Sequence, residues 1–317
     1  MSKYDPYEHW NIRIEEDGSC TRLISVPKIP ATSDEAEAAQ ANESVVTKDV
    51  TLNPDKKTWI RIFRPAKLPA NDQTVARLPI LIYLHGGGWL MFNIDDVMVH
   101  MNCAQFCESL PAIMLSVDYR LAPESRLPTQ YDDVLDSLTW LKNNSTTEPW
   151  IKDYGDMSRV YLYGVSNGGN IAFHTALRAL DVDLSPLRLS GIVLNQPMFG
   201  GKYRTKSELK YATDQLLPLP ALDAMWELTL PKGTDRDHRY CNPMAEGVRD
   251  KVGRLGRCLV IGFGGDPMVD RQQEFVQMLV RAGVRVEARF DDVGFHGVDL
   301  VDPRRASVVI NLVREFI

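Results

Sequence analysis

Residues 164–168 read GVSNG, a G-x-S-x-G pattern that could present Ser166 as a nucleophile. The pattern follows the apolar stretch RVYLYG and precedes GGNIAFHTAL, which has the spacing of a helix. Glycines on both sides permit a turn from strand to helix so sharp that the serine hydroxyl projects above the sheet. A serine that only caps the helix is the structural alternative, because serine is favoured at helix N-termini. The strand before the pattern and the helix after it favour the nucleophile.

Two candidate partners for such a serine follow later in the chain. A nucleophile on this kind of turn requires a carboxylate and then a histidine, each after a late strand. Asp266 comes just after the apolar run CLVIGF, and His296 lies in GFHG after the run RVEARF. Carboxyl ends of neighbouring parallel strands meet at one edge of a sheet, so these side chains should converge there. The set predicts Ser166 as nucleophile, His296 as general base, and Asp266 as the group that holds the imidazole tautomer and stabilises the imidazolium.

Other acids and histidines could compete for these roles. Asp270 is a second carboxylate close to Asp266, and we interpret it as an N-cap of the helix predicted from RQQEFVQML. The remaining histidines lie in loop, helix or insertion contexts or at the start of the triple glycine; they are His9, His85, His100, His174 and His238. His296 follows a late strand in a glycine-flanked loop, so it remains the predicted base.

The segment LHGGGW offers bare backbone directly after an apolar run. Such a loop could cradle a phosphate or surround an oxyanion. A phosphate cradle requires G-x-x-x-x-G-K-S/T, or G-x-G-x-x-G at the start of a helix, and neither spacing is present. Acyl transfer passes through a tetrahedral oxyanion on which amide donors must converge. We therefore expect an oxyanion hole made of the amides of Gly86, Gly87 and Asn167, with Gly88 supporting the turn and His85 in a structural role.

The elements that must position these residues alternate along the chain. A short alternating strand is predicted at 59–63, and apolar runs typical of strands lie at 78–84, 112–119, 159–164, 187–195, 258–263 and 285–290. Segments with helical spacing lie at 97–110, 131–143, 169–180, 272–282 and 304–317. Continuous apolar runs indicate strands buried on both faces. The alternation predicts the α/β class, with a central, mostly parallel sheet covered by helices on both faces.

Two segments break this alternation. Residues 1–50 contain the polar stretch ATSDEAEAAQANES, and residues 200–250 are rich in proline, aspartate and arginine around the apolar patch LPALDAMWELTL. Large sheets of this class often form one unit at this length, so residues 1–317 are expected to be a single domain. The two irregular segments are then expected to cap the active site.

Composition excludes several classes of protein. The net charge is −6 with 25% charged residues, which offers no basic surface for nucleic acid or an anionic membrane. The five cysteines lack C-x-x-C spacing, so neither a disulfide framework nor a zinc site is predicted. The sequence contains no signal-peptide core and no apolar run of the roughly 20 residues that span a membrane. We expect a cytoplasmic protein with no metal, no organic cofactor, and no nucleic-acid or membrane partner.

Three motifs, HGGGW, DYRLAPESRLPTQYDD at 118–133 and GVSNGGN, resemble the hormone-sensitive-lipase branch of the α/β-hydrolases, in particular the plant carboxylesterases. The resemblance covers nearly the whole chain and implies an α/β-hydrolase fold. The short DPYE segment is similar to esterases that deacetylate alkaloid intermediates. The site residues implied by the resemblance match those chosen above: Ser166, Asp266 and His296 for the triad, and Gly86, Gly87 and Asn167 for the oxyanion amides.

The chain departs from the family pattern near the nucleophile. Val165 and Asn167 stand where an acidic residue and an alanine are usual, and Trp89 replaces the more frequent phenylalanine. The amide of Asn167 is unaffected, but its larger side chain is expected to narrow the site or to alter which esters fit. Three aromatic residues near the expected mouth are candidate pocket residues, although such side chains more often pack in a core: Trp89, Phe199 and Trp226.

The DYRLAPE block carries three charged residues that we expect to support the site from beneath. Asp118, Arg120 and Glu124 are predicted to form a buried ion network rather than to contact substrate. The family resemblance implies the same supporting role.

Together these residues predict a serine carboxylesterase that hydrolyses carboxylic esters, including acetyl esters, of small hydrophobic plant metabolites through an acyl-enzyme. The same family fold also hosts dehydratases and cyclases, in which a Ser/His/Asp set could abstract a proton or expel acetate. Elimination or cyclisation is therefore the main alternative. A non-catalytic hormone receptor is disfavoured, because receptors of that type have lost the catalytic histidine and His296 is present here.

Overall fold

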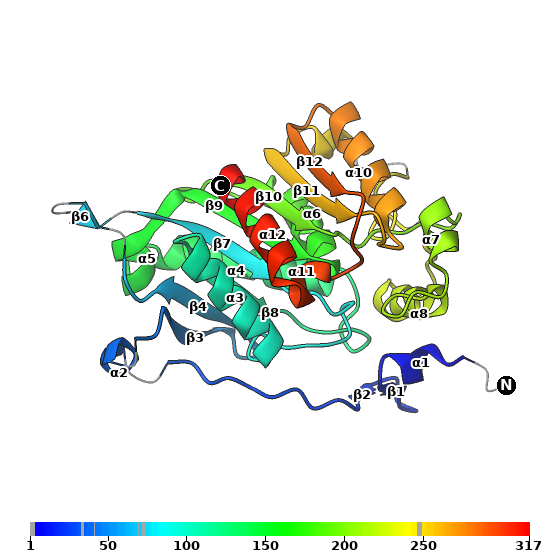
Figure 1. Ribbon diagram of the computed structural model, residues 1–317, viewed down its shortest axis with the longest axis horizontal. Coiled ribbons are helices and arrows are strands. Elements are labelled where there is room, and N and C mark those ends of the chain that lie inside the picture. The colour runs from blue at the N-terminus through cyan, green and yellow to red at the C-terminus, as the bar shows by residue number, and fades with distance from the viewer. Residues whose placement is uncertain are drawn as a thin grey trace.

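The computed structural model describes residues 4–32, 35–40, 42–68, 70–71, 74–75, 77–245 and 249–317. Within these ranges an eight-stranded sheet has the order β12-β11-β10-β9-β7-β8-β4-β3 (Figure 1). Its strands are β3 (Val45–Asn53), β4 (Thr58–Pro65), β7 (Leu78–Leu84), β8 (Ile113–Asp118), β9 (Gly155–Val165), β10 (Leu189–Asn195), β11 (Arg257–Phe263) and β12 (Val286–Asp291). The strands from β12 to β8 pair in parallel, whereas β4 and β3 are antiparallel. The predicted α/β class with a mostly parallel sheet is confirmed.

The apolar runs of the sequence form the centre of this sheet. Strand β7, LPILIYL, is buried at every position. Successive side chains of a strand face opposite sides of the sheet, so Leu81 and Tyr83 join one hydrophobic core while Ile80 and Ile82 join the other. A continuous apolar run therefore marks a strand that is covered on both faces.

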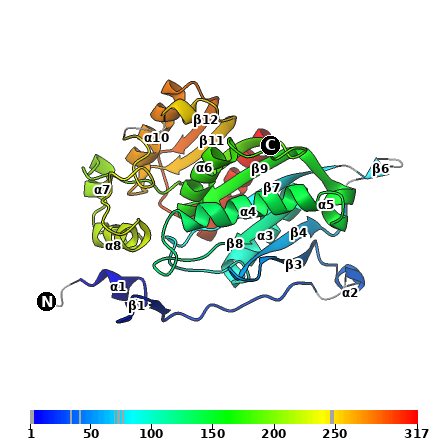
Figure 2. The ribbon, with the colours of Figure 1, turned by 180° about the vertical axis from the view of Figure 1, so that it is seen from behind.

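Helices cover both faces of the sheet. Helices α3 (Val97–Ser109) and α12 (Pro303–Phe316) pack on one face, toward the viewer in Figure 1. Helices α4 (Thr129–Asn144), α6 (Asn167–Ala179) and α10 (Val269–Arg281) cover the other, which Figure 2 shows from behind. The sheet thus lies between two helical layers, as the alternating sequence pattern predicts.

The other elements are α1 (Pro6–His9), β1 (Ile12–Ile14), β2 (Cys20–Arg22), α2 (Glu35–Gln40), β5 (Ala70–Asn71), β6 (Thr74–Val75), α5 (Pro149–Tyr154), α7 (Lys206–Lys210), α8 (Leu219–Thr229), α9 (Arg249–Val252) and α11 (Val298–Val301). None of the helices in the described ranges has the length and apolar character needed to cross a bilayer.

The beginning of the chain meets the irregular segment 200–250. Figures 1 and 2 both show α1 beside α8, and the two helices pack together. The indole Nε1 of Trp10 donates a hydrogen bond to the carbonyl of Ala221 at 3.3 Å. The imidazole Nε2 of His9 lies 3.0 Å from the carbonyl oxygen of Leu216, just before α8. The contact joins two segments that are about 200 residues apart in the sequence.

The predicted N-terminal cap segment, 1–50, is too long. Strand β3 begins at Val45 and pairs with β4 along the antiparallel end of the sheet. Helix α2 lies at that same end, well away from α8 (Figure 1), where the Glu35 carboxylate accepts a hydrogen bond from the indole of Trp150 at 3.0 Å. Only Val46 and Thr47 of strand β3 are buried, and its other residues are partly or fully exposed because the strand lies at the edge. It therefore lacks the continuous apolar run that identified the central strands.

Candidate active site

Ser166 lies in the sharp turn between β9 and α6. Its backbone is in a positive-φ conformation, with φ 56° and ψ −121°, which is strained for a residue with a side chain. The turn requires glycine on both sides: a Cβ on Gly164 would stand 2.0 Å from the carbonyl oxygen of Gly168, and one on Gly168 would stand 2.1 Å from that of Leu84. The G-x-S-x-G pattern thus forms the elbow that its spacing predicts.

The structure brings Ser166, His296 and Asp266 together. The Oγ of Ser166 lies 2.9 Å from Nε2 of His296, and Nδ1 of the same ring lies 2.8 Å from Oδ2 of Asp266. The Asp266 carboxylate is fully buried and also accepts hydrogen bonds from the amide of Met268 at 2.8 Å and from Nε2 of Gln272 at 2.9 Å. These contacts fix the carboxylate, which then orients the imidazole with Nε2 toward the serine.

The surroundings of His296 favour its protonated form. Burial lowers the pKa of the imidazole, but the charge of Asp266 and the hydrogen bond to its carboxylate raise it, and the net pKa lies above the ordinary value. Asp299 and Asp214 act in the same direction from further away. A base that has taken the serine proton is therefore stabilised as an imidazolium by carboxylates on more than one side.

Asp270, the competing carboxylate, makes a different contact from the one expected. Helix α10 begins after Met268, so Asp270 lies inside its first turn and is not the N-cap. Its Oδ2 accepts a hydrogen bond from the amide of Ser207 at 2.8 Å, and Ser207 Oγ donates to the carbonyl of Pro267 at 2.8 Å. The side chain thus ties helix α7 to the loop that carries Asp266, a tertiary contact that local sequence does not reveal.

The triple-glycine loop turns tightly beside the nucleophile. A Cβ on Gly86 would stand 3.4 Å from the Cβ of Ser166, so the two backbones approach closely. Gly87, Gly88 and Trp89 all have positive φ, of 112°, 62° and 62°. A side chain on Gly87 would meet the carbonyl of Met91 at 2.6 Å. Glycine is needed for the conformation and for the close packing alike.

The Asn167 side chain points into the protein and braces this loop. Asn167 is fully buried, and its Oδ1 accepts a hydrogen bond from the amide of Gly88 at 2.8 Å. Its Nδ2 donates to the hydroxyl of Tyr119 at 3.1 Å, and that hydroxyl donates to the carbonyl of His85 at 2.8 Å. The expectation that this side chain narrows the site is therefore wrong, because both of its polar atoms are engaged inside the protein.

His85 supports the same loop. Its ring stacks on Tyr119 with centroids 4.4 Å apart and an interplanar angle of 12°. Its Nδ1 lies 2.6 Å from the carbonyl oxygen of Gly86, and burial lowers the pKa of the ring to about 4. A neutral, buried imidazole stacked on a tyrosine fits the structural role expected for it.

The three candidate pocket aromatics fall into two groups. Trp89 and Trp226 contact each other with ring centroids 4.8 Å apart, and both are buried. Helix α8 also brings Met225 onto the triple-glycine loop, since a Cβ on Gly88 would stand 2.0 Å from the Met225 methyl. Phe199 belongs to the same hydrophobic core but stacks on Phe275, with centroids 4.3 Å apart. Of the three aromatics, the tryptophan pair is the one that joins the 200–250 segment to the loop beside Ser166.

The charged residues of the DYRLAPE block do not form one network. Asp118 accepts a hydrogen bond from the amide of Ile94 at 3.2 Å. Arg120 pairs with Asp133, N to O at 2.6 Å, and Glu124 pairs with Arg22 at 2.9 Å. The single-network prediction is wrong because each side chain points to a different neighbouring segment.

Three buried polar residues beside the triad escaped the sequence analysis: Asn195, Gln196 and Asp299. Asn195 Nδ2 donates to Asp299 Oδ2 at 2.7 Å, and Gln196 Nε2 donates to Asp299 Oδ1 at 2.8 Å. Asn195 ends strand β10, so it lies at the same edge of the sheet as the triad. Its position at the end of the apolar run 187–195 is the signal that could have drawn attention to it.

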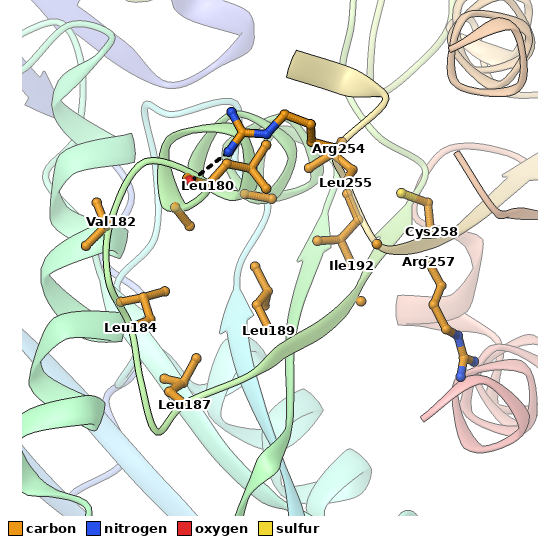
Figure 3. A pocket seen from close by; sticks show the side chains of 14 residues that line it. Leu180, Val182, Leu184, Leu187, Leu189, Ile192, Arg254, Leu255, Arg257 and Cys258 are labelled. Atoms are coloured by element: carbon orange, nitrogen blue, oxygen red, sulfur yellow. Dashed lines mark hydrogen bonds between the residues drawn. The ribbon is translucent and has the colours of Figure 1, made fainter. Parts of the chain in front are cut away.

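A cavity of about 360 Å³ lies at the amino ends of the strands, opposite to the carboxyl ends that carry the triad (Figure 3). These amino ends are called the amino edge of the sheet below, and the carboxyl ends the carboxyl edge. Its walls come from the starts of β10 and β11 and the end of α6, and its aliphatic lining includes Leu180, Val182, Leu184, Leu187, Leu189 and Ile192. At the rim, Arg254 donates a hydrogen bond to the carbonyl of Leu180 at 3.1 Å. No triad residue and no residue of the triple-glycine loop lines this cavity. It is separate from the site around Ser166.

Comparison with protein families gives one match over most of the chain. A family described by the alpha/beta hydrolase fold matches residues 81–300. The match begins within β7 and includes the triple-glycine loop, Ser166, Asp266 and His296.

Several plant proteins are similar over nearly their whole length. Probable carboxylesterase 9 of Arabidopsis thaliana is 55% identical, over 99% of this chain and 97% of its own. A 3-O-acetylpapaveroxine carboxylesterase of Papaver somniferum is 43% identical, over 99% of each chain. Among solved structures, an esterase of Pyrobaculum calidifontis aligns with a TM-score of 0.71 and 23% identity, over 89% of this chain and 88% of its own.

Proposed function

We propose, from the premise that this chain belongs to the α/β-hydrolase family, that Ser166, His296 and Asp266 hydrolyse carboxylic esters through an acyl-enzyme. The resemblance to plant carboxylesterases is confirmed by the relatives, and the chain is a carboxylic ester hydrolase. The assignment of residues, the substrate class and the location in the cell are the proposed parts.

One observation carries the assignment of residues. A continuous relay runs from Ser166 Oγ to His296 Nε2 at 2.9 Å and from His296 Nδ1 to Asp266 Oδ2 at 2.8 Å. The serine hydroxyl is a weak nucleophile until a base removes its proton, and the base must lie within about 3.2 Å. The relay meets that requirement.

In this mechanism Ser166 Oγ attacks the ester carbonyl carbon while His296 Nε2 takes the hydroxyl proton. The tetrahedral intermediate collapses, the bond to the alcohol oxygen breaks, and the imidazolium returns the proton to the leaving alcohol. Water then attacks the acyl-enzyme with His296 as base, and the acid and free serine are released. Asp266 remains ionised and stabilises the imidazolium in both halves.

The proposed oxyanion donors are the amides of Gly86, Gly87 and Asn167. Asn167 is the first residue of α6, so its amide is one of the free donors at a helix N-terminus. Gly86 lies against Ser166, whereas the Gly88 amide is already bonded to the Asn167 side chain. Gly86 and Gly87 are therefore the better donors from that loop, because Gly88 is engaged elsewhere.

The proposed substrates are esters of small hydrophobic plant metabolites, in particular acetyl esters. The relative from Papaver somniferum is named for an acetylated compound, and it is 43% identical over 99% of this chain. Trp89, Trp226 and Met225 bring apolar surface to the triple-glycine loop, which suits an apolar ester. We propose that residues 4–32 and 200–245 form the cap over this surface.

The test is the release of nitrophenol from a nitrophenyl acetate by the purified protein. We expect Ser166→Ala to lower kcat by about 10⁴-fold or more. Ser190→Ala is the matched control, because its hydroxyl bonds to the carbonyl of Ser158 at 2.8 Å near the start of β10. Undiminished turnover in Ser166→Ala would contradict the assignment.

Product analysis with an acetylated plant metabolite tests the reaction type. The deacetylated alcohol and acetate are expected. An alkene or a cyclised product would instead establish elimination or cyclisation by the same residues.

A cytoplasmic location is the remaining part of the proposal. The cysteines Cys20, Cys103, Cys107, Cys241 and Cys258 are free and buried, as in proteins kept in a reducing compartment. Microscopy of a fluorescent fusion in plant cells tests it, and a signal in the secretory pathway or in an organelle would contradict it.

A further inference from the structure

Asp299 is a buried carboxylate that the mechanism above does not use. It lies in α11, three residues after His296, and only 5% of its surface is exposed. Its side-chain partners are the neutral amide groups of Asn195 and Gln196, at 2.7 and 2.8 Å. No ion pair among the described residues includes Asp299. A buried carboxylate without a cationic partner is costly, so its presence beside the triad calls for a role.

Gln196 joins Asp299 to the loop that carries His296. The amide of Gly297, the residue after His296, donates to Gln196 Oε1 at 2.8 Å. Gln196 Nε2 donates to Asp299 Oδ1 on its other side. An ionised carboxylate only accepts and a backbone amide only donates, so Asp299 fixes which end of the Gln196 amide faces Gly297.

Asn195 joins the same carboxylate to the nucleophile. Its side chain donates to Asp299, and its backbone carbonyl accepts a hydrogen bond from the amide of Ser166 at 2.9 Å. Strand β10 lies between β9, which leads to Ser166, and β11, which leads to Asp266. The carbonyl of Ile261 on β11 accepts a hydrogen bond from the amide of Gln196 at 2.8 Å. The end of β10 therefore contacts the turn of Ser166, the loop of His296 and strand β11, which leads to Asp266.

We propose that Asp299 is a positioning residue that holds the His296 loop through Gln196 and supplies a second negative charge to the imidazolium. This proposal rests on the proposed function, since it assigns Asp299 a part in the same serine hydrolysis. Asp266 sets the ring orientation through direct contact. Asp299 acts through Gln196 and through its charge.

The charge part of the proposal follows from the groups that face each side chain. His296 faces Asp266 after β11, Asp299 in α11, and Asp214 in the loop before α8, and each of them raises the pKa of the imidazole. Asp299 in turn faces His296, Tyr83 on β7 and Tyr163 on β9. Burial raises the pKa of Asp299 against the effect of its amide partners and His296, and the net pKa lies above the ordinary value. The two tyrosines are buried with pKa values well above ordinary, so Asp266, Asp299 and Asp214 supply the charge around His296.

The central experiment is Asp299→Asn, assayed with a nitrophenyl acetate across a range of pH. Loss of the charge makes the imidazolium less stable, so the pKa of His296 falls and the acid limb of kcat/KM moves to lower pH. We expect kcat to fall by about ten- to a hundredfold, because the histidine loop is also released, with little change in KM. A role limited to packing would lower the melting temperature without moving the acid limb.

The double variant Gln196→Glu with Asp299→Asn moves the charge and keeps the hydrogen bonds. The carboxylate introduced at position 196 can accept from the amide of Gly297 and from the side-chain amide introduced at position 299, whose oxygen can accept from Asn195. We expect the double variant to recover most of the lost kcat and to return the acid limb toward higher pH. Gln196→Glu alone places two carboxylates together and is expected to be worse than the double variant.

The matched control is Asp302→Asn in the same segment. Asp302 is the N-cap of α12 and accepts a hydrogen bond from the amide of Arg304 at 2.9 Å, so the variant loses one carboxylate without touching Gln196. We expect its pH profile to match that of the wild type. An Asp299→Asn enzyme whose kcat and acid limb both match the wild type overturns this proposal alone. Wild-type protein without esterase activity, or with activity unaffected by Ser166→Ala, overturns the proposed function instead.

Discussion

The two edges of the central sheet are built from opposite kinds of side chain. At the carboxyl edge, the strands end in polar residues that are buried yet bonded to one another, among them Ser166, Asn195 and His296. At the amino edge, the starts of β10 and β11 surround a cavity lined mainly by aliphatic side chains (Figure 3). Both edges belong to the same strands, so the strands do not by themselves decide where chemistry occurs.

The difference shows what each edge can tolerate. A buried polar group needs a specific partner at a specific distance, so a small change at the carboxyl edge leaves donors or charges unmatched. An aliphatic wall needs only side chains that fill its space. A substitution at the amino edge therefore costs packing energy and little else. We therefore expect substitutions at the first edge to affect rate, and substitutions at the second to affect stability.

Replacing Asp266 by asparagine should give the largest contrast. The change keeps the shape but presents the wrong hydrogen-bonding group to His296 Nδ1, and kcat should fall by about 10⁴-fold. Asp270→Asn is the control, since an asparagine side chain can still accept from the amide of Ser207. Steady-state kinetics of both variants measure this difference in kcat. Comparable losses in the two variants would contradict the assignment of Asp266.

Replacing Asn167 by alanine should have an intermediate effect. The amide of Asn167 remains, but Gly88 and Tyr119 lose the side chain that joins them. We expect kcat to fall about tenfold with little change in KM, since removal of a whole oxyanion donor costs about 10²- to 10³-fold.

Asn170→Ala is the control for buried asparagine in the same helix, because Asn170 donates to the carbonyls of Met198 and Tyr240 instead. It should lower the melting temperature and leave kcat nearly unchanged. Equal kcat in Asn167→Ala and wild type would show that the loop keeps its shape without the brace.

The pH profile gives a smaller, graded effect at the same edge. His296 acts as a base only when neutral, and its pKa is raised above the ordinary value by Asp266 against the effect of burial. The acid limb of kcat/KM should therefore lie above the pH at which a free imidazole titrates. Below it the rate should fall about tenfold per pH unit. An acid limb of kcat/KM at or below the pH at which a free imidazole titrates would contradict the raised pKa of His296.

A substitution at the amino edge should have the least effect on rate. Leu187→Ala removes a buried side chain from the cavity wall and should lower the free energy of unfolding by roughly 2–3 kcal/mol, with kcat/KM unchanged. Val182→Ala, at a residue with 38% exposure in the same wall, should cost less. Chemical denaturation and esterase assays on the same samples check both. A loss of kcat/KM in Leu187→Ala would show that the two edges are coupled.

The sequence predicted those parts of the site whose pattern is contained in a few consecutive residues. The elbow around Ser166 could be predicted because its glycines and its strand and helix neighbours are consecutive. The placement of Asp266 and His296 followed from one rule about strand ends. Strand β3 was missed because its residues are mostly exposed or partly exposed at the edge of the sheet, and its sequence VVTKDVTLN contains no continuous apolar run.

The partners of buried side chains could not be predicted in the same way. Asn167 looked like a residue that narrows the pocket, yet it bonds to Gly88 and Tyr119, which are 79 and 48 residues away in the chain. Asp299 and Asn195 are 104 residues apart. Such pairs depend on which strands become neighbours, and no local pattern in either segment records that choice.

The contacts of the proposed cap link the beginning of the chain to the loop beside Ser166. Helix α7 is bonded through Ser207 to Asp270 and Pro267, next to Asp266, and Met225 of α8 packs on Gly88. Residues 4–14 hold α8 from the outside through the side chains of Trp10 and His9. Helix α8 therefore contacts the beginning of the chain and, through Met225, the triple-glycine loop, so a substitution at Trp10 is expected to alter the packing on Gly88.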